Sequence, residues 1–200
     1  MRRIFDDRMR ELLFTGLVAA WLRCDTILPI TIKKERGLPM KVFGKSLSEY
    51  VAFQKWILGL IAVVAIGRLA LSLAGLPNSE VKWLSVTVTG ILAMLYCAVR
   101  VPATGFGSYK HLLPLLVMQG ALANGIVAAA ILIAMATGAD NIYSAPEYSG
   151  GGNGKTWFHA GAHVVLGIVV APLVFWLVGA GIMFIVKKLS PAASSRPSTA

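Results

Sequence analysis

The sequence predicts an all-α integral membrane protein with four transmembrane helices and an N-terminal amphipathic segment at the cytoplasmic membrane interface. Of the 200 residues, 56% are apolar and only 14% are charged, whereas about 25% of the residues in soluble domains are charged. The mean hydropathy is +0.71. Four long apolar stretches come close to or exceed the ~20 residues that cross about 30 Å of hydrocarbon. This composition excludes a soluble globule and a disordered chain, and a content of two cysteines excludes a disulfide-stapled module.

The N-terminal region, residues 1–46, is predicted to be a basic cytoplasmic segment that contains one interfacial helix. The apolar run at residues 12–22 rises only about 17 Å as a helix, which is too short to span a bilayer. Asp6 and Glu11 before this run, and Arg23 after it, do not fit a secretory signal peptide. We therefore expect residues 12–22 to lie in the interface of the cytoplasmic leaflet.

The transmembrane domain is predicted to cover residues 47–188. Ser46, followed three residues later by Glu49, is a capping-box pattern that places the start of the first helix near Leu47. The apolar stretches are too long and too continuous for strands. Residues 189–200 are rich in Ser, Ala and Pro and are predicted to form a disordered cytoplasmic tail. The predicted spans cover about residues 56–75, 83–101, 112–138 and 162–186.

Lysine and arginine are distributed unevenly around the predicted spans. Eleven of the 19 precede the first span, two lie between the second and third, and three follow the fourth, whereas the other two loops hold only Lys82 and Lys155. Because loops rich in these residues stay in the cytoplasm, we expect a multi-pass protein of the plasma (inner) membrane with both termini cytoplasmic. This bias, together with attraction to anionic lipid, explains the net charge of +10. The dispersed basic residues do not indicate nucleic-acid binding.

Three polar residues on three predicted spans are expected at a similar depth. Counted along the helices, Arg68 and Asn124 lie about 18 Å from the inner boundary and Thr89 about 21 Å. An arginine at that depth needs acceptors or water. The cluster is therefore either an anion-recognising or gating site, a structural hydrogen-bond knot, or a snorkelling arginine with no partner. The predicted spans hold no carboxylate, which disfavours a proton-coupled carrier.

A histidine pair stands at the outer mouth of the fourth predicted span. His159 and His163 are four residues apart, which places them on one helix face about 6 Å from each other. This spacing can chelate a metal, with Asp140 and Glu147 of the same loop as candidate further ligands. The alternative is a hydrated pair among the lipid headgroups, and we expect no cofactor. Three histidines in total are too few for two bis-histidine haems.

Other motifs indicate packing rather than catalysis. Residues 150–156 resemble a phosphate-binding loop, but Ser149 stands where that motif needs its first glycine. Gly120 and Gly167 belong to groups of small residues that predict close helix contacts. Pro172 predicts a kink in the fourth span. We therefore expect no enzymatic activity.

The sequence alone favours a non-catalytic accessory or interaction subunit that packs against other membrane proteins or against itself. One alternative is a small channel or carrier for an anion or a neutral solute, built around Arg68, Asn124 and Thr89. A second alternative is a metal- or haem-binding redox subunit that uses His159 and His163.

Overall fold

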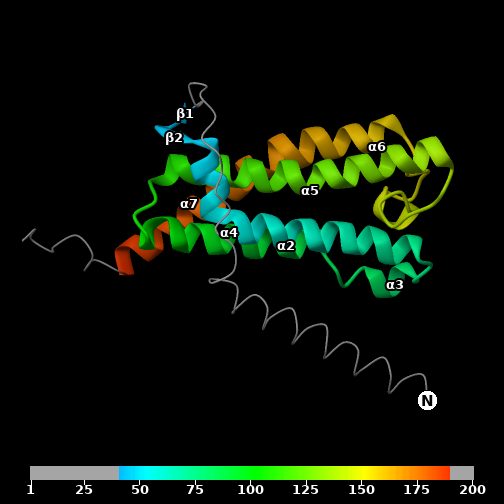
Figure 1. Cartoon of the computed structure of the whole chain (residues 1–200), viewed down its shortest axis with the longest axis horizontal. Helices are drawn as coiled ribbons and strands as arrows, with labels where there is room; N and C mark the ends of the chain where they lie inside the picture. The colour runs from blue at the N-terminus through cyan, green and yellow to red at the C-terminus, as the bar shows by residue number, and fades with distance from the viewer. Residues whose placement is uncertain (1–40, 190–200) are drawn as a thin grey trace, which may run out of the picture. The chain divides into compact units, whose positions relative to one another are not determined.

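In a computed structural model, which describes residues 41–189, the chain is mostly helical (Figure 1). Four helical segments are long and apolar enough to cross a membrane, and they confirm the four predicted apolar helices. The predicted interfacial helix at residues 12–22 lies outside the described residues, as do residues 190–200 of the predicted tail, while Leu189 ends the fourth helical segment. The four segments cover Leu47–Leu73, Asn78–Ala103, Tyr109–Thr137 and Trp157–Leu189.

A short β-hairpin precedes the first long helix and was not predicted. β1 (Lys41–Val42) and β2 (Lys45–Ser46) pair in antiparallel register. The two turn residues, Phe43 and Gly44, have φ values of 53° and 89°, as a two-residue type I′ turn requires. His111 Nε2 donates a hydrogen bond to the Phe43 carbonyl (3.2 Å), which ties the hairpin to the third long helix. The all-α prediction therefore did not include this pair of short strands.

The first long helix, α2 (Leu47–Leu73), begins where the capping box predicts. Ser46 Oγ accepts the Glu49 N–H (3.3 Å), and the Glu49 carboxylate accepts the Ser46 N–H (2.8 Å). These bonds satisfy two backbone donors that a helix start leaves free. One residue inside α2 departs from helical geometry, Gln54 with φ −118° and ψ 18°.

The second and fourth long segments are assembled from several elements, whereas the third is the single helix α5 (Tyr109–Thr137). The third one ends at Gly138 in the left-handed conformation (φ 74°), a common helix stop. The fourth one contains a stretch of π-helix between two α-helices. In chain order the elements are α3 (Asn78–Val81), α4 (Val86–Ala103), α5 (Tyr109–Thr137), the 3₁₀ turn η1 (Pro146–Tyr148), α6 (Trp157–Ala162), the π-helix η2 (His163–Val170) and α7 (Ala171–Leu189).

The long helices lie side by side, with the connections gathered at two ends (Figure 1). We call one end the hairpin end, because it holds the hairpin, the α4–α5 connection and the end of α7. The other, the loop end, holds the α2–α3 connection and residues 138–156. Buried clusters fill the bundle toward each end. The larger one comprises Tyr50, Met94, Cys97, Ala98, Val101, Leu112, Leu115, Leu116 and Met183.

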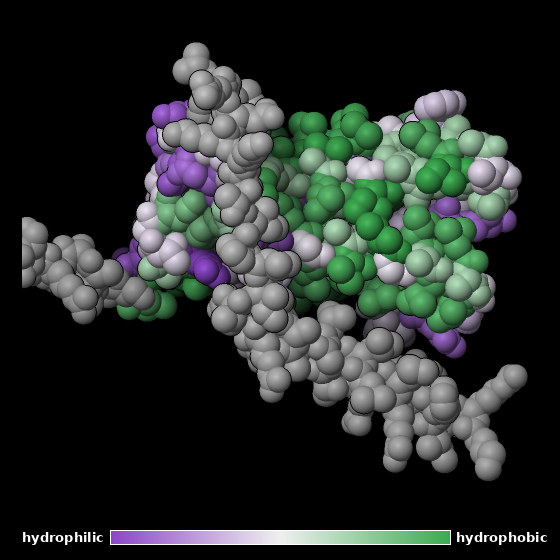
Figure 2. Space-filling view, viewed as in Figure 1, coloured by the Kyte–Doolittle hydropathy of each residue, from purple (hydrophilic) through white to green (hydrophobic). Residues whose placement is uncertain are grey.

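On the face shown in Figure 2, the surface of the bundle is largely apolar over its middle, and hydrophilic residues lie toward its two ends. Large aliphatic side chains on α2 and α7 are more than half exposed, among them Val63 and Leu177. A bilayer-facing surface has this banded pattern, because lipid tails solvate the apolar side chains that would otherwise be buried.

Candidate functional site

A pocket of about 180 Å³ opens between the helices, from the middle of the bundle toward the loop end. The lining residues that the structure describes carry no charge, and three of them are polar: Thr87, Gln119 and Asn124. The walls come from α2, α4, α5, η2 and α7. The full lining is Ile61, Val86, Thr87, Gly90, Leu116, Gln119, Gly120, Ala123, Asn124, Gly167, Ala171, Pro172 and Phe175.

The π-helix η2 leaves one backbone carbonyl of the pocket wall without a helical partner. In an α-helix the Gly167 carbonyl would accept the Ala171 N–H, but this N–H bonds to the Leu166 carbonyl instead. In the π register the donor would be residue 172, and Pro172 has no N–H. The sequence predicts a kink at Pro172. The structure shows in addition a changed hydrogen-bond register before it, which leaves the Gly167 carbonyl without its α-helical or π-helical donor.

Two glycines allow η2 and α5 to approach closely at this point. A Cβ on Gly120 would lie 2.8 Å from the Gly167 carbonyl oxygen and 2.9 Å from Pro172 Cγ. A Cβ on Gly167 would overlap the Asn124 side chain. The small residues that predicted a helix contact therefore do form one at Gly120 and Gly167.

Asn124 joins the pocket to the histidine pair. Its Nδ2 donates to the Gly120 carbonyl (3.2 Å), so its Oδ1 is the atom that accepts from His163 Nδ1 (3.1 Å). His159 Nδ1 donates to the Gly154 carbonyl (2.9 Å). In their neutral forms both rings therefore carry the proton on Nδ1 and present a free lone pair on Nε2. The ring centroids lie 5.1 Å apart, so the predicted pairing of the two histidines on one face is present.

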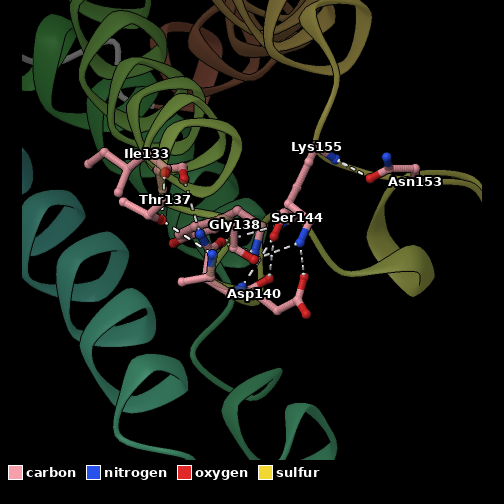
Figure 3. Close-up of polar contacts among 11 residues, drawn as sticks. Ile133, Thr137, Gly138, Asp140, Ser144, Asn153 and Lys155 are labelled. Atoms are coloured by element: carbon pink, nitrogen blue, oxygen red, sulfur yellow. Dashed lines mark hydrogen bonds and ion pairs between the residues drawn. The ribbon is translucent and has the colours of Figure 1, made fainter.

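The two carboxylates predicted as further metal ligands have other partners. Asp140 forms an ion pair with Lys155 Nζ (2.8 Å), which also donates to the Gly138 carbonyl (2.9 Å) (Figure 3). Glu147 accepts a hydrogen bond from Asn78 Nδ2 (3.4 Å). Within residues 41–189, no three His, Cys, Asp or Glu side chains gather as a metal site.

Arg68 lies under the loop at the loop end rather than at the pocket. Its guanidinium carbon is 5.4 Å from the Tyr143 ring centroid and 5.0 Å from that of Tyr148. Thr89 Oγ1 donates to the Ser85 carbonyl of its own helix (2.9 Å). In the described part of the chain, no hydrogen bond joins Arg68, Thr89 and Asn124. A similar depth along three helices did not bring their side chains together, because depth does not fix the direction in which each one points.

The loop above Arg68 is fixed to the bundle by buried hydrogen bonds. The Tyr143 hydroxyl donates to the Ala65 carbonyl (2.9 Å), and Asn141 Nδ2 donates to the Ala130 carbonyl (3.0 Å). Burial raises the pKa of Tyr143 to about 12, an effect that the positive charge of Arg68 partly offsets.

The sequence interpretation missed a buried pair of amides beside the pocket. Gln119 Nε2 donates to Gln54 Oε1 (2.9 Å) and to Cys97 Sγ (3.3 Å), and Gln54 Nε2 donates to the Leu115 carbonyl (3.3 Å). Gln54 was overlooked because the first predicted span starts after it. One signal was available, since the chain has only two glutamines and both fall in or beside apolar stretches.

No family model matches the chain, and comparisons with curated proteins and with solved structures find no match. The geometry of the pocket and of its polar neighbours is therefore the feature that points to a function.

Proposed function

We propose that the chain is a four-span membrane protein whose pocket binds a small uncharged polar solute and lets it cross the bilayer. The single observation that carries this proposal is a pocket between the helices whose described lining is uncharged and includes hydrogen-bonding groups that no helix uses. Lipid-facing helices satisfy their backbone groups internally, and irregular backbone is tolerated where it lines a cavity. A free carbonyl at such a place is typical of a binding site between broken helices.

The pocket offers acceptors to a solute that carries O–H or N–H donors. The Gly167 carbonyl lacks both helical partners. Gln119 Nε2 is engaged with Gln54 and Cys97, while Gln119 Oε1 has no partner among the described residues. Thr87, also in the lining, has a hydroxyl that can donate or accept. These groups suit an alcohol or an amide, whose own donors need acceptors in a site walled mainly by apolar side chains.

The size of the pocket limits the solute. Sites for drug-sized ligands have about 300–1,000 Å³, and a cavity of roughly 150 Å³ takes up a molecule as small as benzene. At about 180 Å³, this pocket fits a solute of only a few heavy atoms.

The absence of charge in the described lining favours a neutral solute over the anion that the sequence also allowed. Moving an isolated ion into an apolar interior costs far more free energy than moving a hydrogen-bonded neutral group. The anion alternative required Arg68 at the site, and Arg68 instead contacts Tyr143 and Tyr148. The accessory-subunit role stays a prediction. Its basis was the scarcity of polar groups in the spans, and the buried Gln54–Gln119 pair weakens that basis.

The distribution of basic residues supports a cytoplasmic hairpin end. Six described lysines and arginines lie near the helix ends at this end of the bundle, against Arg68, Lys82 and Lys155 at the loop end. By the positive-inside rule the chain then enters and leaves the bundle on the cytoplasmic side. The six are Lys41, Lys45, Arg100, Lys110, Lys187 and Lys188.

Solute flux into proteoliposomes tests the proposal, with glycerol, urea and acetamide as probes and light scattering as the readout. Gly90 lines the pocket, and a Cβ there would be 3.8 Å from Phe175, an ordinary contact. Gly90→Leu should therefore fill the pocket without breaking the helices. Gly59→Leu is the matched control, because Gly59 has open space around it.

We expect the wild type and Gly59→Leu to admit at least one probe faster than empty liposomes, and Gly90→Leu to match empty liposomes. The proposal is wrong if the wild type admits none of the three probes, or if Gly90→Leu leaves the flux unchanged.

A further inference from the structure

We propose that Arg68 binds a phosphate group at the loop end, where Tyr143 and Tyr148 of the overlying loop flank its guanidinium. The phosphate belongs either to a lipid headgroup or to a free phosphate ion. This site is separate from the solute pocket, whose described lining does not include Arg68.

Arg68 is a buried cation with an unused donor. Only 9% of the residue is exposed, and its Nε is buried with no hydrogen-bond partner. The ion pairs among the described residues, Lys45–Glu49 and Lys155–Asp140, do not involve it. A buried donor without an acceptor is costly, and such groups in folded proteins nearly always have a partner, including ions and water.

The two aromatic neighbours do not satisfy the hydrogen-bond donors of the Arg68 guanidinium. Tyr143 and Tyr148 lie 5.4 and 5.0 Å from its guanidinium carbon, within the range of cation–π attraction. A ring attracts the charge but is a far weaker acceptor than an anionic oxygen. The Tyr143 hydroxyl is already bonded to Ala65. A phosphate supplies several strong acceptors, and the planar guanidinium can hold two of them at once.

The position of Arg68 brings its side chain within reach of the lipid headgroups in the proposed placement. It lies five residues before the end of α2 at Leu73, or about 8 Å along the helix axis. A long side chain at this depth reaches the headgroups, where tyrosines are also enriched. This step depends on the four-span placement proposed above, whereas binding of free phosphate in detergent does not.

Thermal unfolding of delipidated protein in a phosphate-free maltoside detergent tests the inference. The additives are inorganic phosphate, with chloride at the same ionic strength as control, and phosphatidylglycerol, with diacylglycerol of the same chains as control. We expect a phosphate-bearing additive to raise the melting temperature by about 2–4 °C, the effect of satisfying one buried donor in a chain of this size. Arg68→Gln should lose the rise. Lys82→Gln, which removes another cation at the loop end, should keep it.

A rise with phosphatidylglycerol alone assigns a lipid headgroup, and a rise with inorganic phosphate assigns a free ion. Equal rises with the phosphate-free controls, or an undiminished rise in Arg68→Gln, would overturn the inference. If Arg68→Gln does not fold, Arg68→Lys is the second variant, because it preserves the charge. It should lose most of the rise, because an ammonium cannot present the two parallel donors of a guanidinium, and a full rise in this variant also counts against the site. None of these results depends on whether the pocket conducts solutes.

Discussion

Gly167 affects the pocket geometry in two ways. Its missing side chain leaves room for the Asn124 carboxamide, which would overlap any Cβ at this position. Its carbonyl also supplies the free acceptor in the pocket wall. One position therefore combines a steric requirement with a hydrogen-bonding role.

Gly167→Ala should destabilise the protein and Gly59→Ala should not. Forcing a methyl group against Asn124 should cost about 1–3 kcal/mol, whereas alanine at Gly59, in open space on a helix, should add about 0.5–1 kcal/mol. Thermal unfolding in detergent measures both. Equal melting temperatures for the two variants would show that η2 and α5 are not in close contact.

Because of Tyr143, the stability of the loop end should fall at alkaline pH. Burial raises its pKa in the folded state to about 12 from an ordinary value of 10.0. The unfolded state therefore loses a proton between pH 10 and 12 that the folded state keeps. The stabilising contribution of the phenol is full below pH 10 and is lost as the pH rises toward 12.

The melting temperature of the wild type should therefore fall more steeply from pH 10 to pH 12 than that of Tyr143→Phe. Comparing the two slopes cancels the titration of the lysines, which both proteins share. Parallel slopes would mean that Tyr143 is not buried against Ala65.

For single residues, the sequence shows which side chains are polar or charged better than it shows which residues they contact. The Ser46–Glu49 capping box was predictable because both residues lie within one turn of the same helix. The pairing of His159 with His163 follows from spacing for the same reason. Arg68 was predicted at a similar depth to Asn124, with contact between them as one alternative, but its aromatic neighbours come from a loop more than 70 residues away in sequence. No periodicity in the chain encodes such a contact.

At the scale of elements, hydropathy predicted four helices, and the structure contains them. The departures arise where backbone hydrogen bonding, rather than side-chain polarity, decides the conformation. The hairpin strands have two residues each and show no alternation. Hydropathy does not distinguish the π-helix η2 from an apolar α-helix, so only Pro172 indicated an irregularity.

Pro172→Ala should convert this irregularity into a more regular helix. An alanine N–H at position 172 would give the local carbonyls a donor, with a gain of about 1 kcal/mol in the free energy of unfolding. The free acceptor at Gly167 would be lost, and solute flux should fall below that of the wild type. Thermal unfolding and the proteoliposome assay measure the two effects. Higher stability with unchanged flux would show that the solute does not use this carbonyl.

At the scale of the whole molecule, the proposed orientation places the hairpin end in the cytoplasm. Thr104 at the hairpin end and Gly152 at the loop end are both exposed, and Cys97 is fully buried. With Cys24 replaced by alanine, Gly152→Cys should react with an impermeant maleimide in intact cells. Thr104→Cys should react only after permeabilisation, and the reverse pattern would invert the proposed topology.

The central claim is that a pocket accessible to water and small solutes lies within the membrane-spanning bundle. It can be tested with cysteines at two neighbouring positions of α4. Gly90 lines the pocket, whereas Ile91 is exposed on the outer surface, which faces lipid in the proposed placement. A thiol reacts as its thiolate, which forms in contact with water and not in hydrocarbon.

The decisive measurement uses methyl methanethiosulfonate, a small uncharged thiol reagent. It compares the rates at which this reagent modifies Gly90→Cys and Ile91→Cys, each in protein without Cys24 that has been reconstituted into proteoliposomes. We predict that Gly90→Cys reacts at least about tenfold faster, because each unit by which a thiol pKa is raised in an apolar setting removes a factor of ten in thiolate. The solute that crosses in the flux assay should slow the reaction at Gly90→Cys only. Equal rates at the two positions, or no protection by any conducted solute, would contradict the claim.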